Sequence, residues 1–138
     1  MYISSILKQH GNQTLGLLFN QSSEYGSSLL SSLKGDDHYV RISSTVRAFQ
    51  PDVLFFSVIT GEHNQCIDIN SRLKKEFKFV SVFGGPHVTF FPEIIEQNSD
   101  IDAAGAGECE DAAVELITLI KESKNFNAVQ NFWIRNGS

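Results

Sequence analysis

Residues 79–87 read FVSVFGGPH, and this stretch decides the fold. Its first five residues are apolar except for Ser81, which is typical of a strand buried on both faces of a parallel sheet. Gly84 and Gly85 then remove every Cβ where the strand ends, so a bulky group can approach the backbone there. In open α/β sheets, ligands bind just outside the carboxyl ends of the strands. We therefore expect this turn to mark a binding edge.

The rest of the chain alternates between helical and strand-like patterns. Apolar residues recur at helical spacing in some segments and form short continuous runs in others. This alternation indicates βαβ units, and hence an α/β fold with a parallel sheet covered on both faces. The polar segment at 20–28 is expected to be a loop, and residues 29–33 one helical turn. Helices are expected at 1–10, 39–49 (with Asp37 as N-cap), 66–77, 92–98 and 110–124. Strands are expected at 14–19, 53–58, 79–83, 101–104 and 132–135.

The composition is that of an ordinary globular domain, because a chain of 138 residues with 41% hydrophobic residues can bury its own core. The net charge is -5 and the lysines are scattered, so the chain has no basic face for nucleic acid. No apolar run approaches the ~20 residues of a membrane span, and the N-terminus lacks a signal-peptide pattern. We expect a cytoplasmic location without membrane contact. Cys66 and Cys109 are too far apart for a CxxC motif and are expected to be buried free thiols.

Three loops that follow successive strands should meet at one edge of the sheet. They span residues 57–61, 84–87 and 105–108, and each carries glycine shortly before a helix. Together they predict a cradle for a large planar or phosphate-bearing ligand, because bare backbone amides and helix N-termini suit anions. The alternative is that each glycine only forms the tight turn that an α/β unit needs.

Two polar side chains on these loops have two interpretations each. His87 could donate a hydrogen bond to a ligand oxygen or cap the following helix, and Glu108 could hold a ligand amide or favour a helix start. No Ser-His-Asp or Cys-His arrangement stands out, and no second metal ligand is spaced with His87. The sequence therefore assigns no catalytic residue and no metal ligand.

Four segments resemble the cobalamin-binding domain of cobalamin-dependent radical SAM enzymes: residues 2–11 (YISSILKQHG), 51–61 (PDVLFFSVITG), 83–93 (FGGPHVTFFPE) and 105–108 (GAGE). The resemblance covers nearly the whole chain. It implies a flavodoxin-like, Rossmann-like three-layer sheet with the corrin ring of cobalamin on its carboxyl edge. It also implies a separate radical SAM barrel, in cis or in trans, that holds an iron–sulfur cluster and S-adenosylmethionine. The residues that it places at the corrin and its nucleotide tail are Ser57, Thr60, Gly61, Gly84, Gly85, Pro86, His87, Gly105, Gly107 and Glu108.

The chain departs from this family pattern at three points. A helix at residues 1–10 leaves no first strand and no loop with an axial histidine, so we expect cobalamin to bind without a histidine on cobalt. GAGE at 105–108 replaces the usual GEGE, and no Cys-x-x-x-Cys-x-x-Cys follows. We therefore expect a cofactor domain at 1–125 and a connector toward the barrel at 126–138. The chain alone should not be catalytic.

Two functions remain open. The first is a cobalamin-binding module of a radical SAM system that performs methylation, ring rearrangement or oxidative cyclisation. The second is a Rossmann-like docking or scaffold domain that has lost the cofactor. A missing first strand would also leave the edges of strands 14–19 and 53–58 unpaired, which favours their direct pairing or self-association into a homo-oligomer.

Overall fold

The structure, a computed structural model, describes residues 2–17 and 35–135. They belong to two compact units: residues 1–14 with 52–138 form the first, and residues 15–51 form the second. The first unit contains the sheet and every expected site residue. Among the described helices, none is long and apolar enough to cross a membrane.

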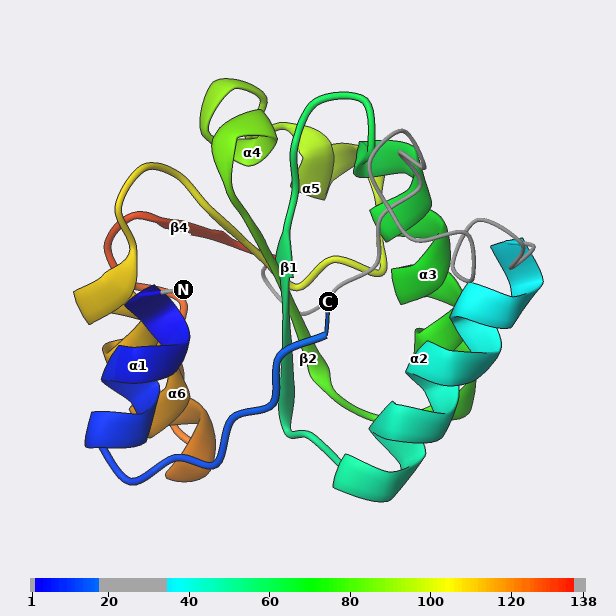
Figure 1. Ribbon diagram of the computed structural model, residues 1–138. Helices are drawn as coiled ribbons and strands as arrows, with labels where there is room; N and C mark the ends of the chain where they lie inside the picture. Colours follow the sequence, from blue (N-terminus) through cyan, green and yellow to red (C-terminus); the bar gives the residue numbers. More distant parts are fainter. Residues whose placement is uncertain (1, 18–34, 136–138) are drawn as a thin grey trace. The chain divides into compact units, whose positions relative to one another are not determined.

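The first unit is built on a sheet whose first three strands are parallel and whose last strand is antiparallel to its neighbour (Figure 1). Ser57 pairs with Gly84, and Phe83 pairs with Ala104. The carboxyl ends of the parallel strands therefore lie at one edge, as the sequence predicts. In spatial order the strands are β1 (Val53–Ser57), β2 (Val80–Gly84), β3 (Ala103–Gly105) and β4 (Phe132–Ile134).

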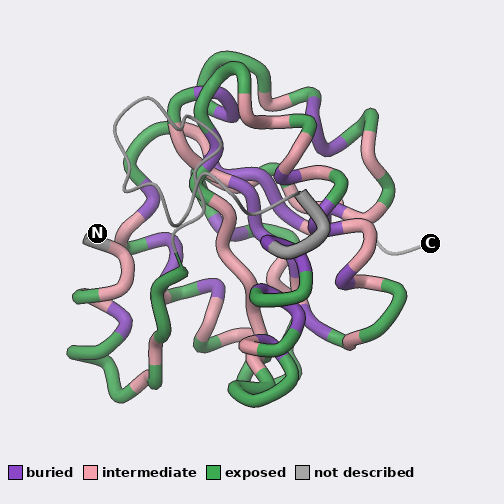
Figure 2. The backbone as a smooth tube through the Cα atoms, turned by 45° about the vertical axis from the view of Figure 1, so that its right-hand side comes forward, coloured by how far each residue is buried: buried purple, intermediate pink, exposed green. Residues whose placement is uncertain are grey.

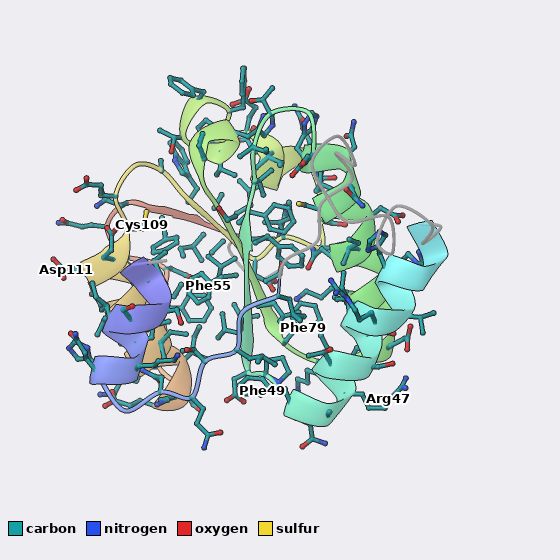
Figure 3. The ribbon with its side chains drawn as sticks, in the orientation of Figure 1. Arg47, Phe49, Phe55, Phe79, Cys109 and Asp111 are labelled. Carbon is teal, nitrogen blue, oxygen red and sulfur yellow. The ribbon has the colours of Figure 1, made fainter. Side chains whose placement is uncertain are left out.

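Helices cover both faces of this sheet, which confirms the α/β class. α1 (Tyr2–Gln9) and α6 (Glu110–Lys121) lie side by side on one face, and α3 (His63–Glu76) lies on the other (Figure 1). Phe55 of β1 points toward the α6 side, where it packs against a buried cluster that includes Leu116 (Figure 3). The amphipathic patterns of α3 and α6 thus bury their apolar faces on opposite sides of the strands.

The middle strands are the most deeply buried part of the unit. Val82 and Phe83 of β2 and Ala103 and Ala104 of β3 expose 1% of their surface or less. Figure 2 shows buried stretches running through the interior, with exposed turns outside them. β1 is only half-buried, as expected for a strand that has one strand neighbour among the described residues.

The second unit contains α2 (Gly35–Phe49), whose stripe of Tyr39, Ile42 and Val46 is buried. The helix begins four residues before Tyr39, so Asp37 lies inside it and the expected N-cap at Asp37 is wrong. Acidic residues are favourable in a first helical turn, and nothing between residues 35 and 38 interrupts the helix.

The expected strand at 14–19 is wrong over its described part, because residues 14–17 have no regular secondary structure. Gly16 weakens a strand in the middle of this run, and Leu15 and Leu17 are exposed. Residues 18 and 19, the expected loop at 20–28 and the expected helical turn at 29–33 lie outside the described residues.

One helix, α4 (Pro86–Phe90), was not predicted from the sequence. It begins directly after the glycine pair, with Pro86 in its first turn, where proline presets a helical backbone. α5 (Ile94–Gln97) is shorter than the helix expected at 92–98. Both helices follow the carboxyl end of β2 and lie at the top of the view in Figure 1.

A polar network joins α3 to the sheet on its buried face. The hydroxyl of Ser81 donates to Asn70 Oδ1 at 2.7 Å, and Asn70 Nδ2 donates to the carbonyl of Asp100 at 2.9 Å. The Asp102 carboxylate accepts from the backbone N–H of Ser81 and from the Lys74 ammonium. Buried polar groups are tolerated only when they are paired, and each of these has a partner.

We expect Ser81→Ala to lower the free energy of unfolding by about 1–3 kcal/mol, because it leaves the buried Asn70 oxygen without its donor. Chemical denaturation measures the difference. Ser99→Ala makes the same chemical change at an exposed turn and should stay within about 0.5 kcal/mol of wild type. Equal effects of the two substitutions would contradict a structural role for the network.

Candidate functional site

The β1–α3 and β2–α4 loops are in direct backbone contact. Gly85 has φ = 99°, and a Cβ at this position would lie 2.8 Å from the carbonyl oxygen of Val58 and 2.9 Å from its nitrogen. Val58 N–H donates to the carbonyl of Gly84 at 2.8 Å, and His87 N–H donates to the carbonyl of Val58 at 3.1 Å. The space left by the missing Cβ of Gly85 is therefore filled by the neighbouring loop.

The two glycines of the pair thus differ in role. Gly84 has an ordinary φ, and a Cβ there would meet no atom within 4 Å. A Cβ at Gly61 or Gly107 would likewise meet no atom within 4 Å, although both glycines have positive φ. The bare backbone that the sequence predicts for a ligand is present at Gly61, Gly84 and Gly107.

Side-chain hydrogen bonds connect the three loops at residues 57–61, 84–87 and 105–108, which we call the cradle. Thr60 Oγ1 lies 3.2 Å from His87 Nδ1, which joins the first loop to the second. Thr89 Oγ1 accepts from the backbone N–H of Gly107 at 3.0 Å and donates to the carbonyl of Gly85 at 3.1 Å. The second loop is thereby joined to the third, so the cradle is held together before any ligand arrives.

The third loop also rests on β4 and on the start of α6. A Cβ at Gly105 would lie 2.8 Å from the Phe132 ring and 3.0 Å from the sulfur of Cys109. Ala106 N–H donates to the carbonyl of Asn131 at 3.0 Å. Gly105, like Gly85, is therefore needed by the packing of the protein itself.

Both cysteines are buried and free, as the sequence predicts. Burial raises the pKa of the Cys66 thiol to about 11, with a further contribution from Glu62. Burial and then Glu110 raise the pKa of Cys109, which lies at the amino end of α6 (Figure 3). Neither thiol is an activated nucleophile at neutral pH, because nucleophilic attack requires the thiolate.

His87 is the most enclosed polar side chain of the cradle, with 8% of its surface exposed. Its ring stacks on the ring of His63, with centroids 4.2 Å apart and planes 9° from parallel, and its centroid lies 5.1 Å from that of Phe91. Burial lowers the pKa of His87 and the neighbouring His63 lowers it further, against a smaller opposing effect of Glu93. His87 is therefore neutral at pH 7, as a hydrogen-bonding and stacking group rather than a cation.

The remaining expected site residues lie on the surface of the cradle. Ser57, Thr60, Pro86 and Glu108 are all exposed. No group of three or more His, Cys, Asp or Glu side chains that could hold a metal ion is found among residues 2–17 and 35–135. The surface of the cradle therefore presents hydroxyl and carboxylate groups beside the glycines 61, 84 and 107, where a Cβ would meet no atom.

Sequence reasoning missed three residues that shape this site: Thr89, His63 and Phe91. Thr89 follows the glycine pair by four residues, but its bond to Gly107 depends on how α4 is placed. His63 carries no motif, and its stacking partner lies 24 positions further along the chain. No local pattern could have identified them.

Known proteins show where the chain belongs. The family model of the B12 binding domain matches residues 1–117, which include all three loops of the cradle. An uncharacterized methyltransferase from Pyrococcus horikoshii is 28% identical over 121 residues, which cover 83% of this chain but only 26% of the relative. Among solved structures, the N-terminal domain of a hypothetical protein from Thermotoga maritima gives a TM-score of 0.48 at 19% identity, over 75% of this chain and 92% of that one.

The unequal roles of the two glycines can be tested by substitution. We expect Gly85→Ala to lower the free energy of unfolding by about 1–3 kcal/mol or more, from its positive φ and its contact with Val58. Gly84→Ala is the matched control and should stay within about 0.5 kcal/mol of wild type. Chemical denaturation of both variants measures their free energies of unfolding. A Gly85→Ala variant as stable as wild type would refute the close contact.

The lowered pKa of His87 predicts a pH dependence of stability. Below the ordinary histidine pKa of about 6.5, His87 is protonated in the unfolded chain but stays neutral in the folded chain. The contribution of His87 to the free energy of unfolding is therefore complete above pH 6.5 and is lost as the pH falls below it. Urea unfolding between pH 8 and 5 should show this loss, and His87→Gln should reduce it. His10→Gln, at the exposed end of α1, is the control; an unchanged pH profile in His87→Gln would exclude the effect.

Proposed function

The chain belongs to the B12-binding domain family, and from this membership we propose that it binds cobalamin across the cradle as the cofactor module of a radical SAM-type enzyme. The observation that carries the proposal is the open backbone at the carboxyl edge of the sheet, at Gly61, Gly84 and Gly107. This edge is where open α/β sheets bind their ligands. The family match spans the same loops.

The residues of the cradle suit cobalamin chemically. The corrin ring is broad and carries carboxamide side chains, which need hydrogen-bond donors and acceptors along its rim. Ser57 and Thr60 offer hydroxyl groups and Glu108 offers a carboxylate, and all three are exposed. Gly84 would let the face of the ring approach the backbone, because no atom occupies the position of its absent Cβ.

Bound cobalamin would supply a redox-active cobalt centre for group transfer. The residues of this chain would hold and orient the ring, and the bonds through Thr60 and Thr89 would keep the cradle in its binding shape. A preformed site spends less binding energy on ordering its loops. No residue of the cradle is proposed as an acid, base or nucleophile.

The chemistry itself is proposed to reside in a separate domain, in cis or in trans. The chain spans only 26% of the length of the P. horikoshii relative, and that relative is named a methyltransferase. We therefore propose methyl transfer as the reaction of the complete system. In this proposal the iron–sulfur cluster and S-adenosylmethionine belong to that other domain.

Cobalamin binding can be measured directly on this chain. After incubation with hydroxocobalamin and desalting, the wild-type protein should retain a corrin absorption spectrum. Gly84→Leu should lower retention by about tenfold, equivalent to about 1.4 kcal/mol, because its side chain fills the open space. Its free energy of unfolding should stay near that of wild type.

Ser99→Leu is the control for an added leucine at an exposed turn, at the opposite end of β3 from the cradle. It should retain corrin as wild type does. A wild-type chain that unfolds cooperatively but retains no corrin would support a docking domain without cofactor instead. Equal retention by Gly84→Leu and wild type would place cobalamin away from the cradle.

A further inference from the structure

A half-open surface pocket of about 500 Å³, which we call the cavity, lies between the first turn of α3, helix α4 and helix α5. Several of its lining residues, among them Asn64, Phe91 and Gln97, are exposed. This volume is within the range of pockets that hold small molecules. His87 belongs to both the cradle and the cavity wall, whereas His63, Phe91, Ile94 and Gln97 line the cavity and are not part of the cradle. The cavity therefore shares one side chain with the surface proposed for cobalamin.

One wall of the cavity is a row of three aromatic rings. His63 and His87 stack almost in parallel, and Phe91 follows at a tilt of 35°. His63 Nδ1 is buried and has no hydrogen-bond partner among the described residues. A flat ring can pack against such a wall through offset or edge-to-face contacts.

The lining also offers neutral hydrogen-bonding groups. Three carboxamides belong to it, those of Asn64 in α3 and of Gln97 and Asn98 at the end of α5. Asn98 Nδ2 donates to the carbonyl of Ile94 at 2.9 Å, so its side-chain oxygen is the group that Asn98 offers to a ligand. Paired donors and acceptors of this kind match the ring nitrogens and amino groups of heterocycles, as when asparagine or glutamine pairs with adenine.

The lining of the cavity contains no lysine or arginine, which disfavours an anionic ligand. Glu93 is the only acidic or basic residue other than histidine among the lining residues. The low pKa of His87, which burial and His63 cause, removes a cation that could otherwise balance a negative ligand. An anion would therefore meet the Glu93 carboxylate, and no lysine or arginine lines the cavity to balance it.

We propose that this cavity is a second small-molecule site, for a flat, uncharged or cationic nitrogen heterocycle that packs on the row of His63, His87 and Phe91. The carboxamides of Asn64, Gln97 and Asn98 would fix its orientation. The heterocycle would be a free nucleoside-type ligand that is distinct from the ligand of the cradle. The proposal stands independently of cobalamin binding.

Adenosine is the probe for an uncharged heterocycle, and benzoate is the flat anion of comparable ring size. In a ¹H–¹⁵N NMR titration of the chain, adenosine should shift the side-chain amide signals of Asn64, Gln97 and Asn98 in a saturable way. Benzoate should not. Saturable binding of benzoate at these groups, or adenosine shifts confined to Gly84 and Gly107, would overturn the proposal.

Two adjacent phenylalanines supply a matched pair of variants. Phe91→Ala removes one ring of the wall and should weaken adenosine binding by about tenfold, whereas Phe90→Ala should leave it unchanged, because Phe90 is 77% exposed and does not line the cavity. Phe91 is itself 46% exposed, so its replacement should not unfold the protein. Equal affinities of the two variants would contradict the site.

Saturating hydroxocobalamin tests whether the cavity is a site of its own. If adenosine still shifts the three carboxamides, the cavity takes a free ligand alongside the cradle. If cobalamin abolishes those shifts and produces its own at the same groups, the cavity is part of the cobalamin site and the proposal of a second site is overturned. The adenosine and benzoate titrations test the cavity even if cobalamin does not bind, so failure of the proposed function would not conceal failure of this inference.

Discussion

The contact between Gly85 and the backbone of Val58 is the constraint on which the rest of the site depends. Because Gly85 has no Cβ and adopts a positive φ, the β1–α3 loop can lie directly against the β2–α4 turn. Two backbone hydrogen bonds, from Val58 to Gly84 and from His87 to Val58, then fix the loops to each other. Any other residue at position 85 would have to separate them.

This contact determines where the other groups of the site can be. It starts α4 immediately after β2, and α4 carries His87 toward Thr60 and Thr89 toward Gly107. Gly105 plays a similar part in the third loop, where Phe132 and Cys109 occupy the space of its missing Cβ. Glycines that pack against the protein hold the cradle together, and the open glycines 61, 84 and 107 leave its surface bare.

His87 connects the cradle to the neighbouring cavity. Its ring is held by Thr60 on the cradle side and by His63 and Phe91 on the cavity side. The same enclosure that lowers its pKa keeps it neutral, so neither surface gains a positive charge from it.

The sequence by itself determined the fold class and which loops meet at the carboxyl edge of the sheet. Apolar runs specified β1 and β2, helical periodicity specified α3 and α6, and the glycine-bearing loops after the parallel strands marked the carboxyl edge. These features are local, because strand burial and helix amphipathicity repeat over a few residues. The strand expected at 14–19 failed over residues 14–17, since a short apolar run becomes a strand only when another strand pairs with it.

Only the tertiary structure decided how the glycines divide into packed and open positions. From the sequence, Gly84 and Gly85 are equivalent, and the difference arises because Val58, 27 positions earlier, fills the space at one and not at the other. The row of His63, His87 and Phe91 and the Thr89 bond to Gly107 likewise join residues whose spacing carries no pattern. Such contacts depend on how the loops pack over the sheet edge. Because they join segments that are distant in the sequence, they produce no repeating residue pattern from which they could be predicted.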